Sequence, residues 1–271
     1  MDKQEKTIPQ KFISINESNQ QQDRYISLIT IIIILSFWVL VTEMRWVRPL
    51  FLPSPQDIWF AFQTLFTNLP GDIFDTLIMR IIPGFLLGSL AGTFIGILMA
   101  MNHISRSIIN PIVEILRPLP PLALIPLLIL WMGIGDGTKI TLIAYGSFII
   151  MVVNSYEAVR NVPPIFIQAA TTLGASGQQI FRHVIIPAII PDIFAGIRVS
   201  AAASFGYSVA AELLGAQSGL GYRLILARRY LKTDNILVIL IIIAFLSFAV
   251  DFIIRRLNDS LTAWKSRLEQ K

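Results

Sequence analysis

The sequence predicts an all-α polytopic membrane protein with six transmembrane helices. Of its 271 residues, 54% are hydrophobic and only 14% are charged, against about 25% charged residues in soluble domains. The mean hydropathy is +0.67. Six apolar runs each approach the length of roughly 17–25 residues that crosses a bilayer. Little of the chain is left over for a separate soluble domain.

The composition also limits the chemistry. There are no cysteines, which excludes disulfides, thiolate metal sites and cysteine nucleophiles. His103 and His183 lie far apart in the sequence, so no metal site is expected. The net charge of +5 is better explained by Lys and Arg retained in cytoplasmic loops than by nucleic-acid binding.

The first apolar run covers residues 26–42 and follows a polar segment, residues 1–25. A cleavable signal would have a shorter apolar core, an earlier start and a small-residue cleavage site. We therefore predict an uncleaved first span that follows a polar cytoplasmic N-terminal segment.

The second run, residues 76–101, contains a stripe of glycines. Gly84, Gly88, Gly92 and Gly96 are each four residues apart. On a helix they form one smooth face that lets another backbone approach closely. The stripe favours tight helix packing.

The third run, residues 108–132, is interrupted by Pro118, Pro120 and Pro121. Proline breaks a helix, and irregular backbone at membrane depth survives only when it is buried in protein or lines a cavity. One interpretation is a kink at the cytoplasmic end with a surface ion pair between Glu114 and Arg117. The other is a broken helix beside a transport path.

The fourth, fifth and sixth runs cover residues 139–158, 191–214 and 236–254. In the fifth run, Gly196, Ser200, Ser204 and Ser208 repeat the small-residue stripe. This face could pack against a helix or offer hydroxyls to a polar solute.

Five charged side chains fall in or near the spans, where a charge costs about 2.5–3.5 kcal/mol on insertion scales. We expect them near span ends or facing protein, with some snorkelling. Arg198 lies well inside the fifth run and is the hardest to explain in this way. The five are Arg80, Arg117, Asp192, Arg198 and Glu212.

Six spans place both termini on the same side of the membrane. That side carries twelve of the loop cations: Lys3, Lys6, Lys11, Arg24, Arg106, Arg160, Arg182, Arg255, Arg256, Lys265, Arg267 and Lys271. The opposite side carries seven: Arg45, Arg48, Lys139, Arg223, Arg228, Arg229 and Lys232. The positive-inside rule therefore predicts cytoplasmic termini, a membrane domain over residues 26–257 and a cytoplasmic tail over residues 258–271.

The cytoplasmic loop of residues 159–188 reads as two helices joined by a turn. Pro163 and Pro164 start the first helix, Gly174 turns the chain, and a second short helix runs to Pro187. At helical spacing, one side of the first helix is apolar: Ile165, Phe166, Ala169, Ala170 and Leu173.

The loop allows three interpretations. The pair could lie in the membrane interface as amphipathic helices. A DNA-binding helix-turn-helix is rejected, because Arg182 is the pair's one basic residue and membrane spans tether both ends. The third interpretation is a docking surface through which a cytoplasmic partner moves the spans.

The loop resembles a motif of the binding-protein-dependent ABC importer permeases, E-A-A-x3-G-x9-I-x-L-P. This chain has Gln168-Ala169-Ala170, then Gly174, then Val184-Ile185-Ile186-Pro187, with the spacing kept throughout. Val184 and Ile186 are conservative departures. Gln168 replaces the acidic residue, which removes a charge-based contact with an ATPase and leaves hydrogen bonding.

The resemblance covers roughly residues 45–257. Residues 49–55 and 210–222 are similar to segments of the taurine, alkanesulfonate, nitrate and bicarbonate branch. This similarity favours taurine or another sulfonate as the solute, with nitrate and bicarbonate as alternatives.

The resemblance implies a type I importer permease fold and a larger assembly. This would hold two permease chains as a homodimer, two cytoplasmic ATPase subunits and an extracytoplasmic solute-binding protein, in a bacterial inner membrane. The loop residues implied to couple to the ATPase are Gln168, Ala169, Ala170, Leu173, Gly174 and Pro187.

The chain itself should not hydrolyse ATP. A phosphate-binding loop needs G-x4-G-K-[ST], and residues 133–139 have no adjacent Gly-Lys. ATP and Mg²⁺ are therefore expected on the partner ATPase, and no cofactor on this chain.

An anionic solute needs donors along its path, and the pathway candidates are Arg198, Ser200, Ser204 and Ser208. On the outer side, Arg223, Arg228 and Arg229 could attract an anion or dock the binding protein, or form only a solvated basic surface.

Two other function classes fit less well. An intramembrane enzyme would need converging titratable groups, but the apolar runs contain no histidine. A secondary transporter often shows inverted repeats, and none is evident here. A channel has no need of a tethered coupling loop.

Overall fold

The computed structural model describes residues 19–262 and divides into two compact units, Met1–Phe60 and Ala61–Lys271, which are described separately. The predicted N-terminal segment, residues 1–25, lies largely outside the described residues. So does most of the predicted tail, residues 258–271.

The first unit contains α1 (Asn19–Glu43), whose Tyr25–Glu43 stretch is long and apolar enough to cross a membrane. It also contains the start of α2 (Pro55–Leu65), a helix that the sequence analysis did not predict. A reciprocal cap begins α2: the backbone N–H of Ser54 donates to the Asp57 carboxylate, and the N–H of Asp57 donates to the Ser54 hydroxyl.

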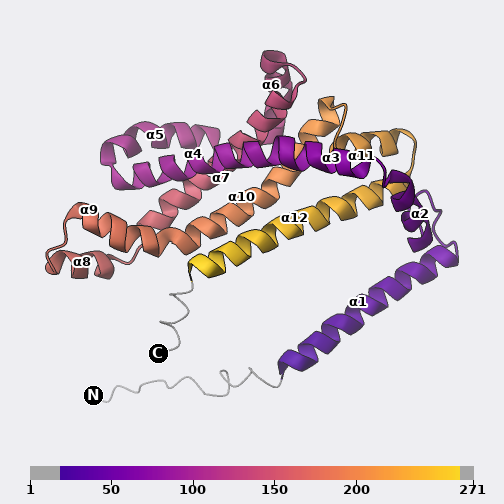
Figure 1. The fold of residues 1–271 in the computed structure, drawn as a ribbon, viewed down its shortest axis with the longest axis horizontal. Coiled ribbons are helices and arrows are strands. Elements are labelled where there is room, and N and C mark those ends of the chain that lie inside the picture. The colour runs from indigo at the N-terminus through magenta and orange to yellow at the C-terminus, as the bar shows by residue number, and fades with distance from the viewer. Residues whose placement is uncertain (1–18, 263–271) are drawn as a thin grey trace, which may run out of the picture. The chain divides into compact units, whose positions relative to one another are not determined.

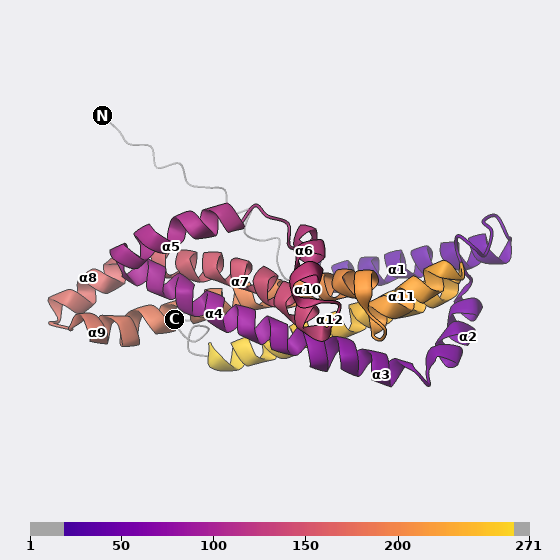
Figure 2. The same ribbon diagram turned by 90° about the horizontal axis from the view of Figure 1, so that it is seen from above.

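The second unit is built on one long helix packed against α7 (Asp136–Arg160). The long helix comprises α3 (Leu69–Ile73), the π-helical segment η2 (Phe74–Ile81) and α4 (Ile82–Met101). It begins before the predicted residue 76. Figure 2 shows α4 running alongside α7.

The glycine stripe of α4 faces the α7 backbone. A Cβ atom added to Gly92 would lie 2.6 Å from the carbonyl oxygen of Phe148, and one added to Gly96 would lie 2.5 Å from that of Val152. Side chains at these positions would force the helices apart. The prediction of tight packing is confirmed.

The third predicted span is broken. α5 (His103–Leu116) is followed by the 3-10 turn η3 (Pro121–Leu124) and α6 (Ile125–Met132), and the two halves are bent by 82°. The prolines remove the backbone donors that would continue α5. In Figure 1, α6 projects away from α4 and α7. The break in the helix is confirmed, and its predicted place beside a transport path stays a prediction.

The predicted ion pair between Glu114 and Arg117 is absent. Glu114 instead accepts a hydrogen bond of 2.9 Å from the side-chain amide of Asn110, one turn earlier on the same helix. The kink with a surface ion pair is therefore wrong.

The loop and the fifth predicted span form one continuous helical stretch, Gly177–Gly215. It consists of α9 (Gly177–Ile180), the π-helical segment η4 (Phe181–Ile185) and α10 (Ile186–Gly215). The prediction that a short helix ends at Pro187 is wrong. The N–H of Ile186 bonds to the carbonyl of Phe181, and this wider turn lets Pro187 enter without ending the helix.

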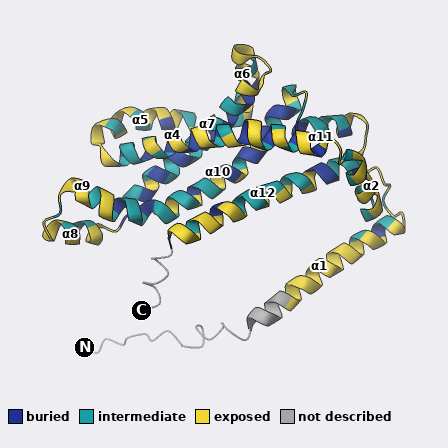
Figure 3. Ribbon diagram, viewed as in Figure 1, coloured by how far each residue is buried: buried dark blue, intermediate teal, exposed yellow. Residues whose placement is uncertain are grey.

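Two further helices complete the unit, α11 (Leu220–Arg229) and α12 (Thr233–Leu261). Buried residues gather on α7 and α10, and α8 and much of α12 are exposed (Figure 3). Five described helices are long and apolar enough to cross a membrane, or six if the bent pair α5–α6 counts as one span. The predicted all-α, six-span architecture agrees with this arrangement.

Candidate functional site

The loop of residues 159–188, predicted to be cytoplasmic, begins with a short helix that ends in a defined turn. α8 runs over Pro164–Thr172, and Gly174 follows it with φ of +78°. The N–H of Ala175 bonds to the carbonyl of Ala170, and that of Gly174 to the carbonyl of Thr171, both at 3.0 Å. This pair of bonds is the Schellman motif, which favours glycine at the left-handed position.

A second cap starts the next helix only two residues later. The N–H of Ser176 donates to the Gln179 side-chain oxygen at 2.8 Å, and the N–H of Gln179 donates to the Ser176 hydroxyl at 3.4 Å. These reciprocal bonds form a capping box. The turn between α8 and α9 is thus fixed by hydrogen bonds on both sides.

α8 presents an uncovered apolar face, because none of its residues is buried. Phe166 is 53% exposed, Ile165 63% and Leu173 88%. Gln168 and Ala169 are also exposed, while Ala170 and Pro187 are half-buried. The predicted apolar side of this helix therefore exists and faces outward from the bundle.

An apolar cluster joins α7 to the helical stretch η4–α10, the two elements between which α8 lies in the chain. It contains Ala158 near the end of α7, Val162 just after it, Ile185 at the end of η4 and Ile189 in the first turn of α10. The loop is therefore attached to α7 and α10 through packed side chains as well as through the chain itself.

At the opposite end of the bundle lies a buried charge cluster that the sequence analysis did not assemble. The Arg80 guanidinium donates to Glu212 at 2.8 Å and to Asp136 at 2.7 Å. The side chains of Arg80 and Glu212 are 3% and 0% exposed. The sequence analysis expected these two charges near span ends or facing protein, and their burial agrees with the second alternative. It did not pair them with each other.

The cluster also holds the loop that follows α10. Glu212 accepts from the N–H of Gly221 at 2.7 Å, and Asp72 accepts from the N–H of Gly219 at 3.0 Å. Arg80 donates to the Ser218 carbonyl at 2.9 Å. These bonds tie residues 218–221 to the start of the long helix.

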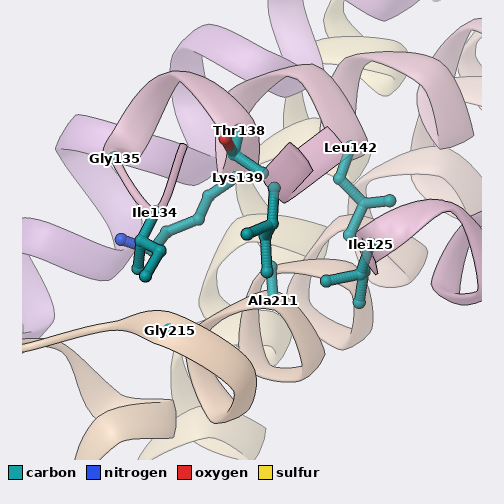
Figure 4. Close-up of a pocket in the computed structure, with 9 residues that line it drawn as sticks. Ile125, Ile134, Gly135, Thr138, Lys139, Leu142, Ala211 and Gly215 are labelled. Atoms are coloured by element: carbon teal, nitrogen blue, oxygen red, sulfur yellow. The ribbon is translucent and has the colours of Figure 1, made fainter. Parts of the chain in front are cut away.

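Lys139 joins this network from α7. Its ammonium donates to Asp136 at 3.0 Å. In Figure 4 the nitrogen of Lys139 lies beside Ile134, whereas Leu142 and Ile125 lie on the other side of the pocket. Lys139 is therefore not a free loop cation, although it was counted among those of the outer side.

The three serine candidates of α10 lie within the helix bundle, where each is fully buried. The hydroxyls of Ser204 and Ser147 are 3.0 Å apart, and those of Ser200 and Ser89 are 3.4 Å apart. Ser208 donates to Glu212 at 3.2 Å. Their positions fit the packing alternative, and a role along a pathway stays a prediction that needs α10 to separate from α7.

Arg198 faces α12 and pairs with Asp251 at 2.7 Å. That carboxylate also accepts from Arg255 at 2.6 Å. The acidic partner on another predicted span explains how Arg198 is tolerated inside an apolar run. Its predicted place along a pathway is not tested by this contact.

The three basic candidates predicted to contact an anion or the binding protein, Arg223, Arg228 and Arg229, divide into two kinds. Arg223 pairs with the largely buried Asp72 at 2.5 Å. Arg228 and Arg229 end α11 and have no carboxylate within ion-pair distance among residues 25–262. Of these three candidates, Arg228 and Arg229 are therefore the two that no described carboxylate pairs.

Several helices long and apolar enough to span a membrane, with an exposed short helix between two of them, are typical of the transmembrane subunit of a transporter. Comparison with known families supports this class. The family described as binding-protein-dependent transport system inner membrane component matches residues 88–263. The chain therefore belongs to this family of ABC transporter permeases.

Two relatives are similar over most of the chain. One is the taurine transport system permease protein TauC of Escherichia coli, 33% identical over 255 residues, which cover 90% of this chain and 91% of that protein. The other is the putative aliphatic sulfonates transport permease protein SsuC of Bacillus subtilis, 34% identical over 240 residues, which cover 88% and 86%.

The fold also matches a solved structure, the inward-facing MetNI methionine ABC transporter. The TM-score is 0.60 at 23% identity, over 70% of this chain and 94% of the matched chain. The type I importer permease fold is thereby confirmed. As a permease subunit of this inner-membrane family, the chain carries no ATPase domain.

Proposed function

We propose that this chain is the translocation subunit of an ATP-driven importer for taurine or another small organic sulfonate. The observation that carries the solute class is the similarity to a taurine permease and to a sulfonate permease, each over more than four fifths of the chain. Both relatives are described by solutes that bear the same anionic group. A sulfonate cannot cross lipid unaided, which is consistent with active transport.

The coupling step is proposed to act through α8. Its exposed apolar face, with Ile165, Phe166 and Leu173, fits a groove on a cytoplasmic ATPase subunit. Gln168 and Ala169 lie on the same exposed helix. Because an apolar cluster ties the loop to α7 and α10, movement of the ATPase would be transmitted to both spans.

The proposed assembly contains two copies of this chain, two ATPase subunits that bind ATP and Mg²⁺, and a solute-binding protein outside the membrane. Both termini are proposed to be cytoplasmic, which puts α8 on the ATPase side. Arg228 and Arg229 at the end of α11 would then face the binding protein. Two cations at a helix C-terminus also stabilise the helix through its dipole. Stabilising α11 and docking the binding protein are compatible roles.

The test is reconstitution of the chain in liposomes with the ATPase and binding protein encoded beside it. ATP hydrolysis is measured with the binding protein loaded with taurine, ethanesulfonate, nitrate or bicarbonate. We expect taurine or ethanesulfonate to stimulate hydrolysis several-fold and to accumulate inside. Stimulation by nitrate or bicarbonate alone would contradict the proposed solute.

A further inference from the structure

We infer that a cavity beside the broken span binds the sulfonate group of the solute on its way through the membrane. The inference rests on the proposed function and extends it to a site within the spans. The cavity has a volume of about 330 Å³ and lies between the α5–η3 break, α7 and α10. That volume is at the lower end of the range for small-molecule sites.

The cavity lies at the depth of the membrane interior. Tyr145 is nine residues from the outer end of α7, or about 14 Å at 1.5 Å per residue. Asn154 is six residues from the inner end of the same helix, or about 9 Å. The lining is mostly apolar and includes four polar side chains, those of Arg117, Tyr145, Asn154 and Tyr207. Polar groups that face lipid at this depth are costly, so their gathering around one cavity favours a polar ligand there.

The one charged residue of the cavity lining is a cation. Arg117 lies where α5 ends, and no acidic side chain lines the cavity. Within the described part of the chain, no carboxylate lies within ion-pair distance of Arg117. An unpaired guanidinium at a polar cavity fits an anion, and its planar donors suit the oxygens of a sulfonate.

A phenol of α7 binds the end of α5 at the break. The Tyr145 hydroxyl donates to the carbonyl of Leu116 at 2.8 Å, and the same carbonyl accepts from the backbone N–H of Leu119 at 3.1 Å. This bond fixes the end of α5 against α7. Arg117, the next residue, is thereby positioned at the cavity.

The opposite wall supplies uncharged donors. Tyr207 of α10 lies across Gly146 of α7, where a Cβ atom would collide with its ring. Its hydroxyl makes no hydrogen bond with another described residue, so it is free to donate to a ligand. Asn154 uses one amide hydrogen on the Ile150 carbonyl at 2.8 Å and keeps its other hydrogen and its oxygen.

The lining also suits the opposite end of an aminosulfonate such as taurine. Tyr145 and Tyr207 line the cavity, and aromatic rings attract an ammonium group through cation–π interaction. The Asn154 oxygen is a hydrogen-bond acceptor in the same lining. A second cavity of about 390 Å³, lined by Arg80, Asp136 and Lys139, is less suitable. There the cations are already paired with carboxylates.

The test uses the absence of cysteine from the chain. Asn154→Cys introduces a single thiol into the cavity of the full-length chain in permeabilised membranes, and Ile150→Cys gives a second reporter on the same wall. Each is treated with anionic methanethiosulfonate ethylsulfonate or with its cationic trimethylammonium analogue. Ser260→Cys, at the exposed end of α12, is the control.

We expect the cavity thiols to react roughly tenfold faster with the anionic reagent, because a unit positive charge lies nearby. Ethanesulfonate should slow this reaction, and Arg117→Gln should abolish both the preference and the protection. The Ser260→Cys thiol should be unaffected by ethanesulfonate. Unreactive cavity thiols, equal rates with both reagents, or absence of protection would overturn the site.

The labelling is independent of ATP hydrolysis, so the two proposals fail separately. A sulfonate-protected thiol in a chain that binds no ATPase would leave the cavity site standing and remove the importer function. An importer whose cavity thiols show no charge preference would leave the importer function standing and remove the cavity site.

Discussion

At the scale of single residues, Gly174 is the position where the coupling loop depends most on one amino acid. Its φ of +78° is a conformation that side chains disfavour, and the space around it is open. Alanine there would cost about 1–2 kcal/mol through backbone strain alone. The Schellman turn would then compete with other loop conformations.

We therefore expect Gly174→Ala to reduce solute-stimulated ATP hydrolysis while the chain still inserts and folds. Gly177→Ala is the matched control, because Gly177 also has open space around it but no left-handed φ. The measurement is ATPase activity of the reconstituted complex. Equal loss in both variants would show that the turn geometry is not what matters.

Glu212 is the residue on which the outer charge cluster depends. It accepts hydrogen bonds from Thr76, Arg80 and the Gly221 backbone, and it is 1% exposed. Glu212→Gln would leave the Arg80 charge buried with only Asp136 as its ionic partner. Removing one partner of a buried pair costs about 3–5 kcal/mol.

The expected result for Glu212→Gln is a clear fall in the thermal unfolding temperature of the purified chain in detergent. Asp259→Asn, an exposed carboxylate near the end of α12, should change stability by no more than about 0.5 kcal/mol. A Glu212→Gln protein as stable as this control would contradict the role of the buried pair.

Single residues could be placed from the sequence where their signals are local, but not where distant helices bring them together. The start of α8 at Pro164 and the turn at Gly174 could be predicted, because their signals are local in the sequence. The charge cluster could not, because Asp72, Arg80, Asp136 and Glu212 are brought together only by helix packing across the chain. Arg198 was the charge hardest to explain from the sequence, because its acidic partner lies on another helix, α12.

At the scale of elements, the packing of α4 on α7 is the contact most open to test. A Cβ atom on Gly92 would lie 2.6 Å from a backbone oxygen, which cannot move aside without shifting α7. Overpacking of this kind costs about 1–3 kcal/mol. Gly92→Ala should therefore lower the unfolding temperature in detergent.

Gly206→Ala provides the comparison. Gly206 lies on α10 and has nothing within 4 Å of its added Cβ atom. Alanine there should be neutral or slightly stabilising, because it favours helix over glycine by about 1 kcal/mol. If Gly92→Ala were as stable as Gly206→Ala, the close approach of the two helices would be wrong.

The effect of prolines on helix boundaries was predicted correctly at one place and wrongly at another. Pro118, Pro120 and Pro121 break a helix, as expected. Pro187, which was expected to end one, lies inside a continuous helical stretch. The difference is the π-helical turn before Pro187, whose wider hydrogen bonding has no signature in the sequence.

At the scale of the whole molecule, the orientation in the membrane is a prediction from loop charge. The excess of Lys and Arg on the side of the termini predicts that both face the cytoplasm. A green fluorescent protein fused after Lys271 should fluoresce, and alkaline phosphatase inserted at Lys232, between α11 and α12, should be active. The opposite pattern would place α8 outside the cell and remove the coupling proposal.

The central claim is that an ATPase docks on the exposed face of α8, and co-purification tests it most directly. The tagged chain is expressed with its neighbouring genes, and the ATPase that accompanies it in detergent is quantified. Leu173→Asp puts a charge on a side chain that is 88% exposed, and Leu261→Asp makes the same change at the end of α12, where Leu261 is 55% exposed. We expect equal amounts of ATPase and permease for the unaltered chain and for Leu261→Asp, and loss of the ATPase with Leu173→Asp. A chain that purifies alone, or an ATPase that stays bound to Leu173→Asp, would contradict the claim.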